Sequence, residues 1–231
     1  LFRAHHNKAF LEILRDLNPV EEVRSLRSRV YGSYSEFDRD ADSLTYPAVI
    51  KPSAGDSGRG VALVRNPRQA RMHALRASLA LDRRELWRNA YRRTFMKGWR
   101  PDSFAKRKFI VQEFVPGLDH DWKVIVFGPK YFVTTRPTRS SDFRASGSRA
   151  PRSYPTKLPD GLLDFLEKVF TAFHAPFASI DVMHDGQRFY LGEIQFVRFG
   201  TGAVIRTPQH FRRVDGRWTC IPGRSEWEPE L

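Results

Sequence analysis

Apolar residues recur at helical spacing in three parts of the chain, and each part predicts a helix. The first helix is predicted over 1–17 and ends at Asn18-Pro19, because proline disfavours the helical conformation in the residue before it. The second is predicted to begin at Asn66-Pro67, where asparagine caps a helix and proline fits its first position, and to run to about Arg93. The third is predicted over 160–173.

Short apolar runs bounded by turn residues predict strands in the rest of the chain. The first two strands flank a glycine-rich loop and the last two flank a short turn, so each pair is predicted to form a hairpin. No regular structure is predicted over 31–46, over the long loop 137–157, or in the polar tail after Thr207. The order of elements predicts an α+β fold with mostly antiparallel pairs. The predicted strands are 48–50, 60–64, 109–114, 122–127, 131–135, 177–183 and 188–195.

The composition is that of a globular protein, with 41% hydrophobic and 13% aromatic residues. A length of 231 residues is enough for one large domain or two small ones. No apolar run approaches the roughly 20 residues of a membrane span, and the first residues lack the apolar core of a signal peptide. The single cysteine, Cys220, excludes an internal disulfide and a cysteine-based zinc site, which predicts a cytoplasmic location. Because the chain starts at Leu1, we expect further residues upstream.

The charge balance favours an anionic partner. The chain has 39 basic and 26 acidic residues, a net charge of +13. ATP is one such partner, but its few phosphates do not require so large a charge. Nucleic acid, an acidic polymer or an acidic protein would account for the rest, and so would arginine-rich faces that are simply solvated.

A cation followed by a glycine-rich loop predicts a phosphate-binding hairpin. Lys51 closes a strand, and the loop after it contains Ser57, Gly58 and Gly60. Glycines let backbone N–H groups approach a phosphate closely, and Ser57 adds a hydroxyl donor. The loop leads into a strand, so it is neither a P-loop nor a dinucleotide fingerprint. A flexible hairpin without a ligand is the alternative.

Two further stretches suit a nucleotide. The strand that ends in Gln112-Glu113-Phe114-Val115 offers free backbone groups that suit the edge of an adenine. Asp121 and Lys123 point to the same face of the next strand, where a carboxylate suits a ribose hydroxyl and a cation suits a phosphate. By itself each stretch is also an ordinary strand end.

The hairpin near the end of the chain carries a candidate magnesium site. Asp181 and Glu193 lie in apolar strands, and Gln195 follows two residues later. Carboxylates in such surroundings need a partner, and Mg²⁺ prefers hard oxygen ligands. Salt bridges to Arg188 or Arg198 are the alternative. The metal hypothesis requires both carboxylates on one face, which predicts an odd-length loop or a β-bulge near 184–187.

In this order and spacing, the motifs resemble those of the ATP-grasp ligases, especially the branch of ribosomal-protein glutamate ligases and related carboxylate–amine ligases. The resemblance covers roughly residues 1–205. It rests on Asn7-Lys8, Ile50-Lys51-Pro52 with its glycine loop, Gln112-Glu113-Phe114-Val115, Asp121-Trp122-Lys123, Arg136, Asp142-Phe143-Arg144-Ala145-Ser146-Gly147, Asp181 and Glu193-Ile194-Gln195.

The resemblance implies an ATP-grasp fold, in which two α+β subdomains with mostly antiparallel sheets grip ATP. Residues 1–115 would form the first subdomain, with a helical linker at about 66–107, and 116–231 the second. The amino-terminal domain that precedes this core in most relatives is expected to be absent. Gln195 stands where the family usually has asparagine, and Ser148 stands where relatives often keep a second glycine.

The resemblance also implies roles for individual residues. Lys8 and Lys51 would contact the phosphates together with the glycine loop, and the 112–115 stretch would hold the adenine. Asp121 would bind the ribose. The implied catalytic residues are Arg136, Lys123 and Arg144, with Ser146 in the acceptor pocket. The implied magnesium ligands are Asp181, Glu193 and Gln195.

The implied activity is ATP-dependent amide formation from a carboxylate and an amine, through an acyl phosphate and with Mg²⁺ and ATP as cofactors. Neither substrate is named by the sequence. The alternative is a non-catalytic module of the same fold that binds nucleic acid or another acidic partner, which the charge of +13 and Gln195 favour. A third hypothesis is a kinase-like phosphorylation of a hydroxyl.

Overall fold

The computed structural model describes residues 7–54, 60–79, 83–98, 107–138, 152–197 and 199–223. The chain forms two compact units. The smaller unit consists of 28–55 and 59–114. The larger unit contains the residues up to Arg27 together with those from Val115 onward. The sequence-based division into 1–115 and 116–231 follows chain order, whereas the structure groups the first 27 residues with the later part of the chain.

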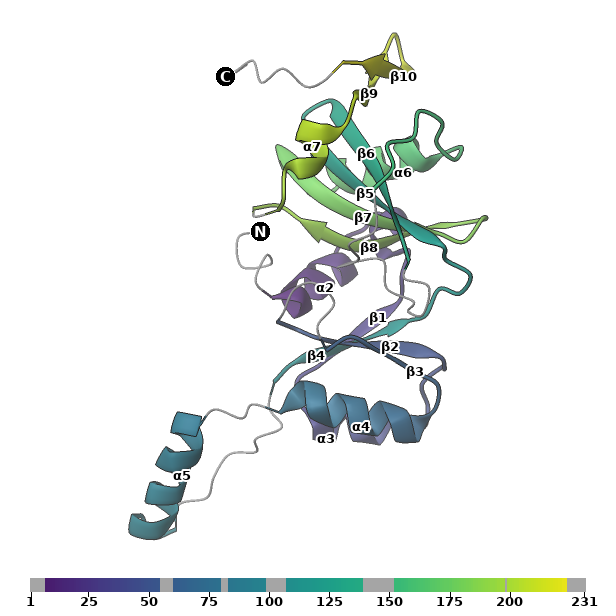
Figure 1. Cartoon of the computed structure of the whole chain (residues 1–231). Helices are drawn as coiled ribbons and strands as arrows, with labels where there is room; N and C mark the ends of the chain where they lie inside the picture. The colour runs from purple at the N-terminus through teal and green to yellow at the C-terminus, as the bar shows by residue number, and fades with distance from the viewer. Residues whose placement is uncertain are drawn as a thin grey trace. The chain divides into compact units, whose positions relative to one another are not determined.

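The smaller unit is a four-stranded antiparallel sheet in the order β1-β4-β2-β3 (Figure 1). Its core joins the sheet to two helices through the stacked and edge-on rings of Tyr31, Phe37 and Phe109 and through the small residues Ala70 and Ala74. The elements are β1 (Ser28–Tyr31), α3 (Tyr34–Asp40), β2 (Ala48–Pro52), β3 (Ala62–Val64), α4 (Pro67–Ser78), α5 (Arg83–Phe95) and β4 (Phe109–Glu113).

The alternation of side chains along β2 determines which face carries Lys51. Ala48 and Ile50 belong to the core on the helix side. Since successive residues of a strand point to opposite faces, Val49 and Lys51 lie on the face away from α3 and α4.

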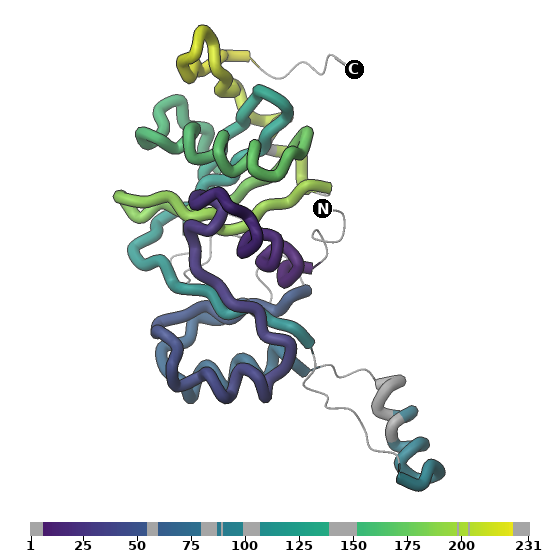
Figure 2. Tube along the Cα trace, turned by 180° about the vertical axis from the view of Figure 1, so that it is seen from behind, coloured from purple at the N-terminus to yellow at the C-terminus, as the bar shows by residue number. Residues whose placement is uncertain are grey.

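The larger unit is a six-stranded antiparallel sheet in the order β10-β9-β6-β5-β7-β8 (Figures 1 and 2). One face packs on α6, α2 and η1 through a core that includes Val124, Val133, Ile180 and Leu166. The elements are α2 (Lys8–Asp16), η1 (Glu21–Arg24), β5 (His120–Phe127), β6 (Lys130–Pro137), α6 (Leu162–Thr171), β7 (Phe177–His184), β8 (Phe189–Gln195), α7 (Gly202–Arg206), β9 (Gln209–Val214) and β10 (Arg217–Pro222).

The observed elements confirm the α+β prediction and correct it in several places, and β1, η1 and α7 are elements that the sequence did not predict. The stretch 31–46 contains α3, whose only fully buried side chain is Phe37, so its helical period is not visible in the sequence. The helix predicted to run from 67 to 93 ends at Ser78, because Leu79 takes an extended conformation, and α5 follows separately. The tail after Thr207 contains β9 and β10, in which Phe211 is buried while most other residues are half-buried or exposed, so the tail has no clear apolar run.

None of the helices in the described part of the chain is both long and apolar enough to cross a bilayer.

Candidate functional site

One face of the larger sheet gathers the polar side chains that the sequence singles out. Residues directly opposite each other in an antiparallel pair project to the same face. The register pairs Asp121 with Arg136, Lys123 with Asp181, and Asp181 with Glu193. Four adjacent strands therefore present their polar residues together, opposite the apolar core. These residues are Asp121, Lys123, Thr134, Arg136, Ser179, Asp181, Glu193 and Gln195.

A β-bulge at Gly192 brings the two carboxylates to one face. The register shifts between Asp181 and Val182, so that Asp181 pairs with Glu193 while Val182 pairs with Leu191. The extra residue is Gly192, where an added Cβ would lie 3.2 Å from the carbonyl oxygen of Asp181. The sequence prediction of a bulge is confirmed, but its place is in β8 and not near 184–187. Leu191 and Ile194, both buried and three residues apart, are the signal that locates it.

Two residues that the sequence analysis missed support this bulge. The guanidinium of Arg15, which is only 2% exposed, donates to the carbonyl of Leu191 at 2.9 Å and to that of Gly192 at 3.5 Å. The backbone N–H of Leu191 donates to the hydroxyl of Ser25 at 2.9 Å. Because β8 is the last strand of the sheet, these side chains satisfy backbone groups that no neighbouring strand reaches.

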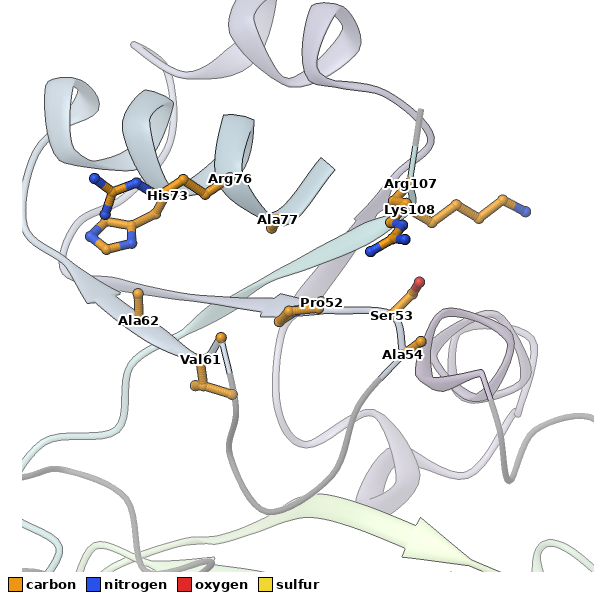
Figure 3. Close-up of a pocket in the computed structure, with 11 residues that line it drawn as sticks. Pro52, Ser53, Ala54, Val61, Ala62, His73, Arg76, Ala77, Arg107 and Lys108 are labelled. Atoms are coloured by element: carbon orange, nitrogen blue, oxygen red, sulfur yellow. The ribbon is translucent and has the colours of Figure 1, made fainter. Parts of the chain in front are cut away.

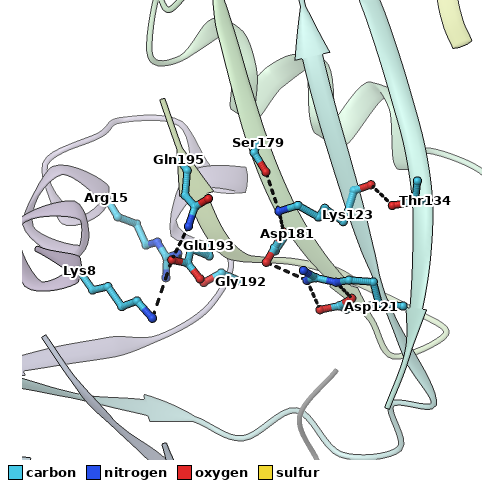
Figure 4. A network of polar contacts seen from close by, with 11 residues as sticks. Lys8, Arg15, Asp121, Lys123, Thr134, Ser179, Asp181, Gly192, Glu193 and Gln195 are labelled. Atoms are coloured by element: carbon cyan, nitrogen blue, oxygen red, sulfur yellow. Dashed lines mark hydrogen bonds and ion pairs between the residues drawn. The ribbon is translucent and has the colours of Figure 1, made fainter. Parts of the chain in front are cut away.

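Arg136 connects the carboxylates of Asp121 and Asp181, which Figure 4 labels together with Lys123 and Ser179. Its Nε donates to Asp121 at 2.7 Å, and its Nη2 donates to Asp121 at 2.5 Å and to Asp181 at 2.8 Å. Lys123 donates to the other oxygen of Asp181 at 3.1 Å and to the hydroxyl of Ser179 at 2.7 Å. Asp181 is therefore paired with Lys123 and Arg136 rather than with Arg188.

Lys123 and Arg136 determine the pKa of the Asp181 carboxyl. Burial acts to raise the pKa of its carboxyl, but Lys123 and Arg136 outweigh burial and hold the pKa at about 2. Burial raises the pKa of Asp121 in spite of the hydrogen bonds from Arg136, and the Asp181 carboxylate adds to this increase. The pKa of the Arg136 guanidinium is raised by the two carboxylates although burial opposes this. At neutral pH Asp181 is therefore an anion, and the Arg136 guanidinium beside it is a cation.

Glu193 is less completely paired than Asp181. Among the described residues its carboxylate pairs with Lys8 of α2 at 3.9 Å, and it also accepts a hydrogen bond of 3.2 Å from the Gln195 amide. Like charges directly opposite each other on neighbouring strands repel, so a further cation between them would stabilise the Asp181–Glu193 pair. Carboxylate and amide oxygens are the ligands that Mg²⁺ prefers. The residues present therefore fit a magnesium ion held by Asp181, Glu193 and Gln195.

The residues predicted to bind the nucleotide divide between the two units. Lys51 ends β2, and Gln112, Glu113 and Phe114 lie at the end of β4 in the smaller unit. Gln112 is buried, whereas Lys51 and Glu113 are half-buried. Lys8, Val115 and Asp121 belong to the larger unit. The predicted residues Ser57, Gly58, Arg144 and Ser146 lie outside the described residues.

Gly60 lines a cationic hollow in the smaller unit (Figure 3). It has a φ of +72°, and a Cβ there would lie 2.8 Å from Pro52, so the turn into β3 requires glycine. His73 and Arg76 project from α4 at one end of the hollow, and Arg107 lies at the other. These cations were not predicted from the sequence, because arginine side chains on helix faces and loops are ordinarily solvated. Since Pro52 shares its face of β2 with Ile50, the hollow is on the opposite face from Lys51.

Comparison with solved structures identifies this architecture. An ATP-grasp RimK domain protein from Sphaerobacter thermophilus superposes with a TM-score of 0.50 at 19% identity, over 85% of this chain and 61% of that chain. The biotin carboxylase domain of 2-oxoglutarate carboxylase from Hydrogenobacter thermophilus, in complex with MgADP, gives a TM-score of 0.57 at 14% identity, over 86% and 41% of the two chains. The chain has the ATP-grasp fold.

The similarity also extends to sequence. The ligase LysX of Sulfurisphaera tokodaii, named as an α-aminoadipate–LysW ligase, is 27% identical over 152 residues, or 65% of this chain and 46% of the relative. The chain thus spans about half the length of the curated relatives that it matches. No protein-family model matches it. The resemblance to ATP-grasp carboxylate–amine ligases is confirmed.

Proposed function

We propose that this ATP-grasp chain is an ATP-dependent carboxylate–amine ligase. The observation that carries the proposal is the paired carboxylates Asp181 and Glu193, which a bulge places on one face beside Lys123 and Arg136. A structural salt bridge needs only one cation for each carboxylate. Here Asp181 is paired with two cations, Lys123 and Arg136. The carboxylate of Glu193 is half-exposed, and its pair with Lys8 is 3.9 Å long.

The proposed magnesium ligands are Asp181, Glu193 and Gln195. When bound, Mg²⁺ neutralises negative charge on the phosphates and so favours transfer of the γ-phosphoryl group. Because Gln195 already donates its amide N–H to Glu193, its carbonyl oxygen is left to act as a ligand. The longer arm of glutamine relative to asparagine is compatible with this position next to Glu193.

The proposed nucleotide-binding residues come from both units. In the smaller unit Lys51, the glycine loop with Ser57, Gly58 and Gly60, and the 112–114 strand end are assigned to the phosphates and the adenine. In the larger unit Val115 is assigned to the adenine, Lys8 to the phosphates and Asp121 to the ribose. Asp121 accepts two hydrogen bonds from Arg136, so its position is fixed before any ligand arrives.

The proposed reaction has two steps. A substrate carboxylate oxygen attacks the γ-phosphorus of ATP, which releases ADP and forms an acyl phosphate. An amine nitrogen then attacks the acyl carbon, phosphate leaves, and the amine proton passes to solvent. Arg136 and Lys123 are cations fixed by Asp121, Asp181 and Ser179, so they stabilise developing negative charge without rearranging. Arg144 is assigned to the acceptor pocket.

Thermal unfolding with ligand tests the nucleotide and metal assignment. We expect Mg-ATP to raise the Tm of the wild-type chain, because a ligand that binds only the folded state stabilises it. Asp181→Asn and Glu193→Gln should reduce this increase. Asp215→Asn is the matched control, since Asp215 is an exposed carboxylate in the β9–β10 turn. If Mg-ATP does not stabilise the wild-type chain, the proposal fails.

Phosphate release with a panel of substrates tests the reaction type. The panel pairs carboxylates, including α-aminoadipate and glutamate, with small amines and with peptides that offer an amine. A ligase releases inorganic phosphate only when both substrates are present, and it forms an amide that mass spectrometry detects. A stable phosphorylated product without phosphate release would instead indicate a kinase.

A further inference from the structure

Helix α5 carries aromatic residues that are not used in the core of its unit. Trp87, Tyr91 and Phe95 are 79%, 61% and 70% exposed, and Met96, just beyond the helix, is 51% exposed. The three aromatic residues are spaced four apart, so they lie on one side of the helix. The rings of Tyr91 and Phe95 are 4.8 Å apart at their centroids, which makes the stripe continuous. Monomeric proteins seldom expose contiguous apolar surface of this kind unless it binds a partner.

The neighbouring helix α4 shows what a structural helix of this unit looks like. It buries the small residues Ala70 and Ala74 against the sheet and turns arginines outward. Among the large apolar residues of α4, Met72 and Leu75 are 43% and 40% exposed, whereas Trp87, Tyr91 and Phe95 of α5 are 79%, 61% and 70% exposed. Burial in the unit's own core therefore does not account for the aromatic stripe.

The composition around the stripe matches that of protein–protein interfaces. Aromatic residues, methionine and arginine are enriched in interface cores, and tryptophan, tyrosine and arginine most often contribute the largest binding energies. Arg88 and Arg92 directly follow Trp87 and Tyr91 along the helix, so they flank the stripe on one side.

The charge of this segment determines the kind of partner. The segment from Trp87 to Lys97 contains four basic residues and no acidic one. Arg88, Arg93 and Lys97 are exposed. An acidic surface with apolar side chains would pair with both the arginines and the rings.

We propose that α5 is a docking helix for an acidic polypeptide segment, whose apolar side chains cover Trp87, Tyr91 and Phe95 and whose carboxylates pair with the flanking arginines. This binding surface does not depend on ATP or on the ligase assignment.

Fluorescence anisotropy on the full chain, without nucleotide, tests the proposal. The probe is a labelled 20-residue peptide in which glutamate and leucine recur at helical spacing. We expect Trp87→Ala and Arg92→Ala each to weaken binding at least tenfold. The matched controls are Leu17→Ala, which removes another exposed apolar side chain (76% exposed), and Arg212→Ala, which removes another exposed arginine. Both should stay within twofold of wild type, and all variants should keep the wild-type Tm.

Two outcomes would overturn the assignment. The first is an equal loss of affinity in the α5 variants and the controls, which would show that net charge alone attracts the peptide. The second is a preference for another polyanion. A labelled single-stranded oligonucleotide and vesicles of phosphatidylglycerol are measured in parallel, and Trp87-dependent binding of either one, tighter than binding of the peptide, would identify a different partner.

Discussion

Arg136 is the residue on which the polar network of the larger unit depends most. It bridges Asp121 and Asp181, and all three side chains are less than a fifth exposed. Its removal leaves two carboxylates with Lys123 as their remaining cation in the network. Removing one partner of a buried pair is far more costly than losing an exposed pair.

We therefore expect Arg136→Met to lower the free energy of unfolding by about 3 kcal/mol, measured by urea denaturation. Arg71→Met is the matched control, because Arg71 also bridges two aspartates, Asp38 and Asp42, but at the surface. It should cost much less than Arg136→Met, because exposed ion pairs are screened by solvent. Equal losses in the two variants would show that the Arg136 network is effectively solvated.

Gly192 is a second residue whose substitution is expected to lower the stability of the chain. A Cβ there meets the carbonyl oxygen of Asp181 at 3.2 Å, and that oxygen belongs to a ladder that cannot shift freely. We expect Gly192→Ala to destabilise the chain by about 1 kcal/mol and to weaken stabilisation by Mg-ATP. Gly202→Ala, where a Cβ meets nothing within 4 Å, should be neutral in the same denaturation experiment. A fully stable Gly192→Ala chain would contradict the tight bulge.

At the scale of elements, the β7–β8 hairpin is closed by a side chain. Asp185 accepts backbone hydrogen bonds from Gln187 at 2.9 Å and Arg188 at 2.7 Å, and a hydroxyl bond from Tyr190 at 2.8 Å. These bonds, first that from Arg188, lower the pKa of its carboxyl from 3.8 to about 2. The turn thus helps to hold the two strands that carry the candidate metal ligands.

This pKa shift makes the contribution of the turn depend on pH. Because the folded-state pKa lies below the unfolded value, the stabilisation is complete above pH 3.8 and is lost as the pH falls toward 2. Asp185→Ala should therefore be less stable than wild type at pH 6, and the difference should shrink between pH 4 and pH 2. Asp185→Asn retains an acceptor oxygen and should show a smaller loss with little pH dependence. Urea denaturation at each pH measures both.

At the scale of the whole molecule, the elements predicted from the sequence are those that contribute several apolar residues to the core of their own unit. The strands β4 to β8 and helix α6 all bury apolar residues in a core, and their ranges agree with the prediction to within a few residues. Helix α3 was missed because a single residue, Phe37, anchors it. The β9–β10 hairpin was missed because it is held by Arg213 on Asp164 and Glu167, contacts that no local pattern reveals.

The candidate site was also predicted only in part. Its carboxylates and cations were predicted because they interrupt apolar strands in a recognisable order. Arg15 and Ser25 were not, because they act on β8 from more than 160 residues away in sequence. The place of the bulge was also missed, although the three-residue spacing of Leu191 and Ile194 was visible in the sequence.

The pairing of β1 with β4 has a consequence for how the chain can be divided. The chain enters the smaller unit at Ser28 and leaves it after Phe114, and Ser28 lies directly opposite Gln112 in the β1–β4 ladder. Entry and exit are therefore neighbours, as they are in a domain inserted into a host. Replacing 28–112 with a short glycine-serine linker should leave a shorter chain that folds, since Arg15 and Ser25 remain to close the edge of β8. A chain cut once at Val115 loses both residues, exposes that edge and should aggregate, which light scattering would detect.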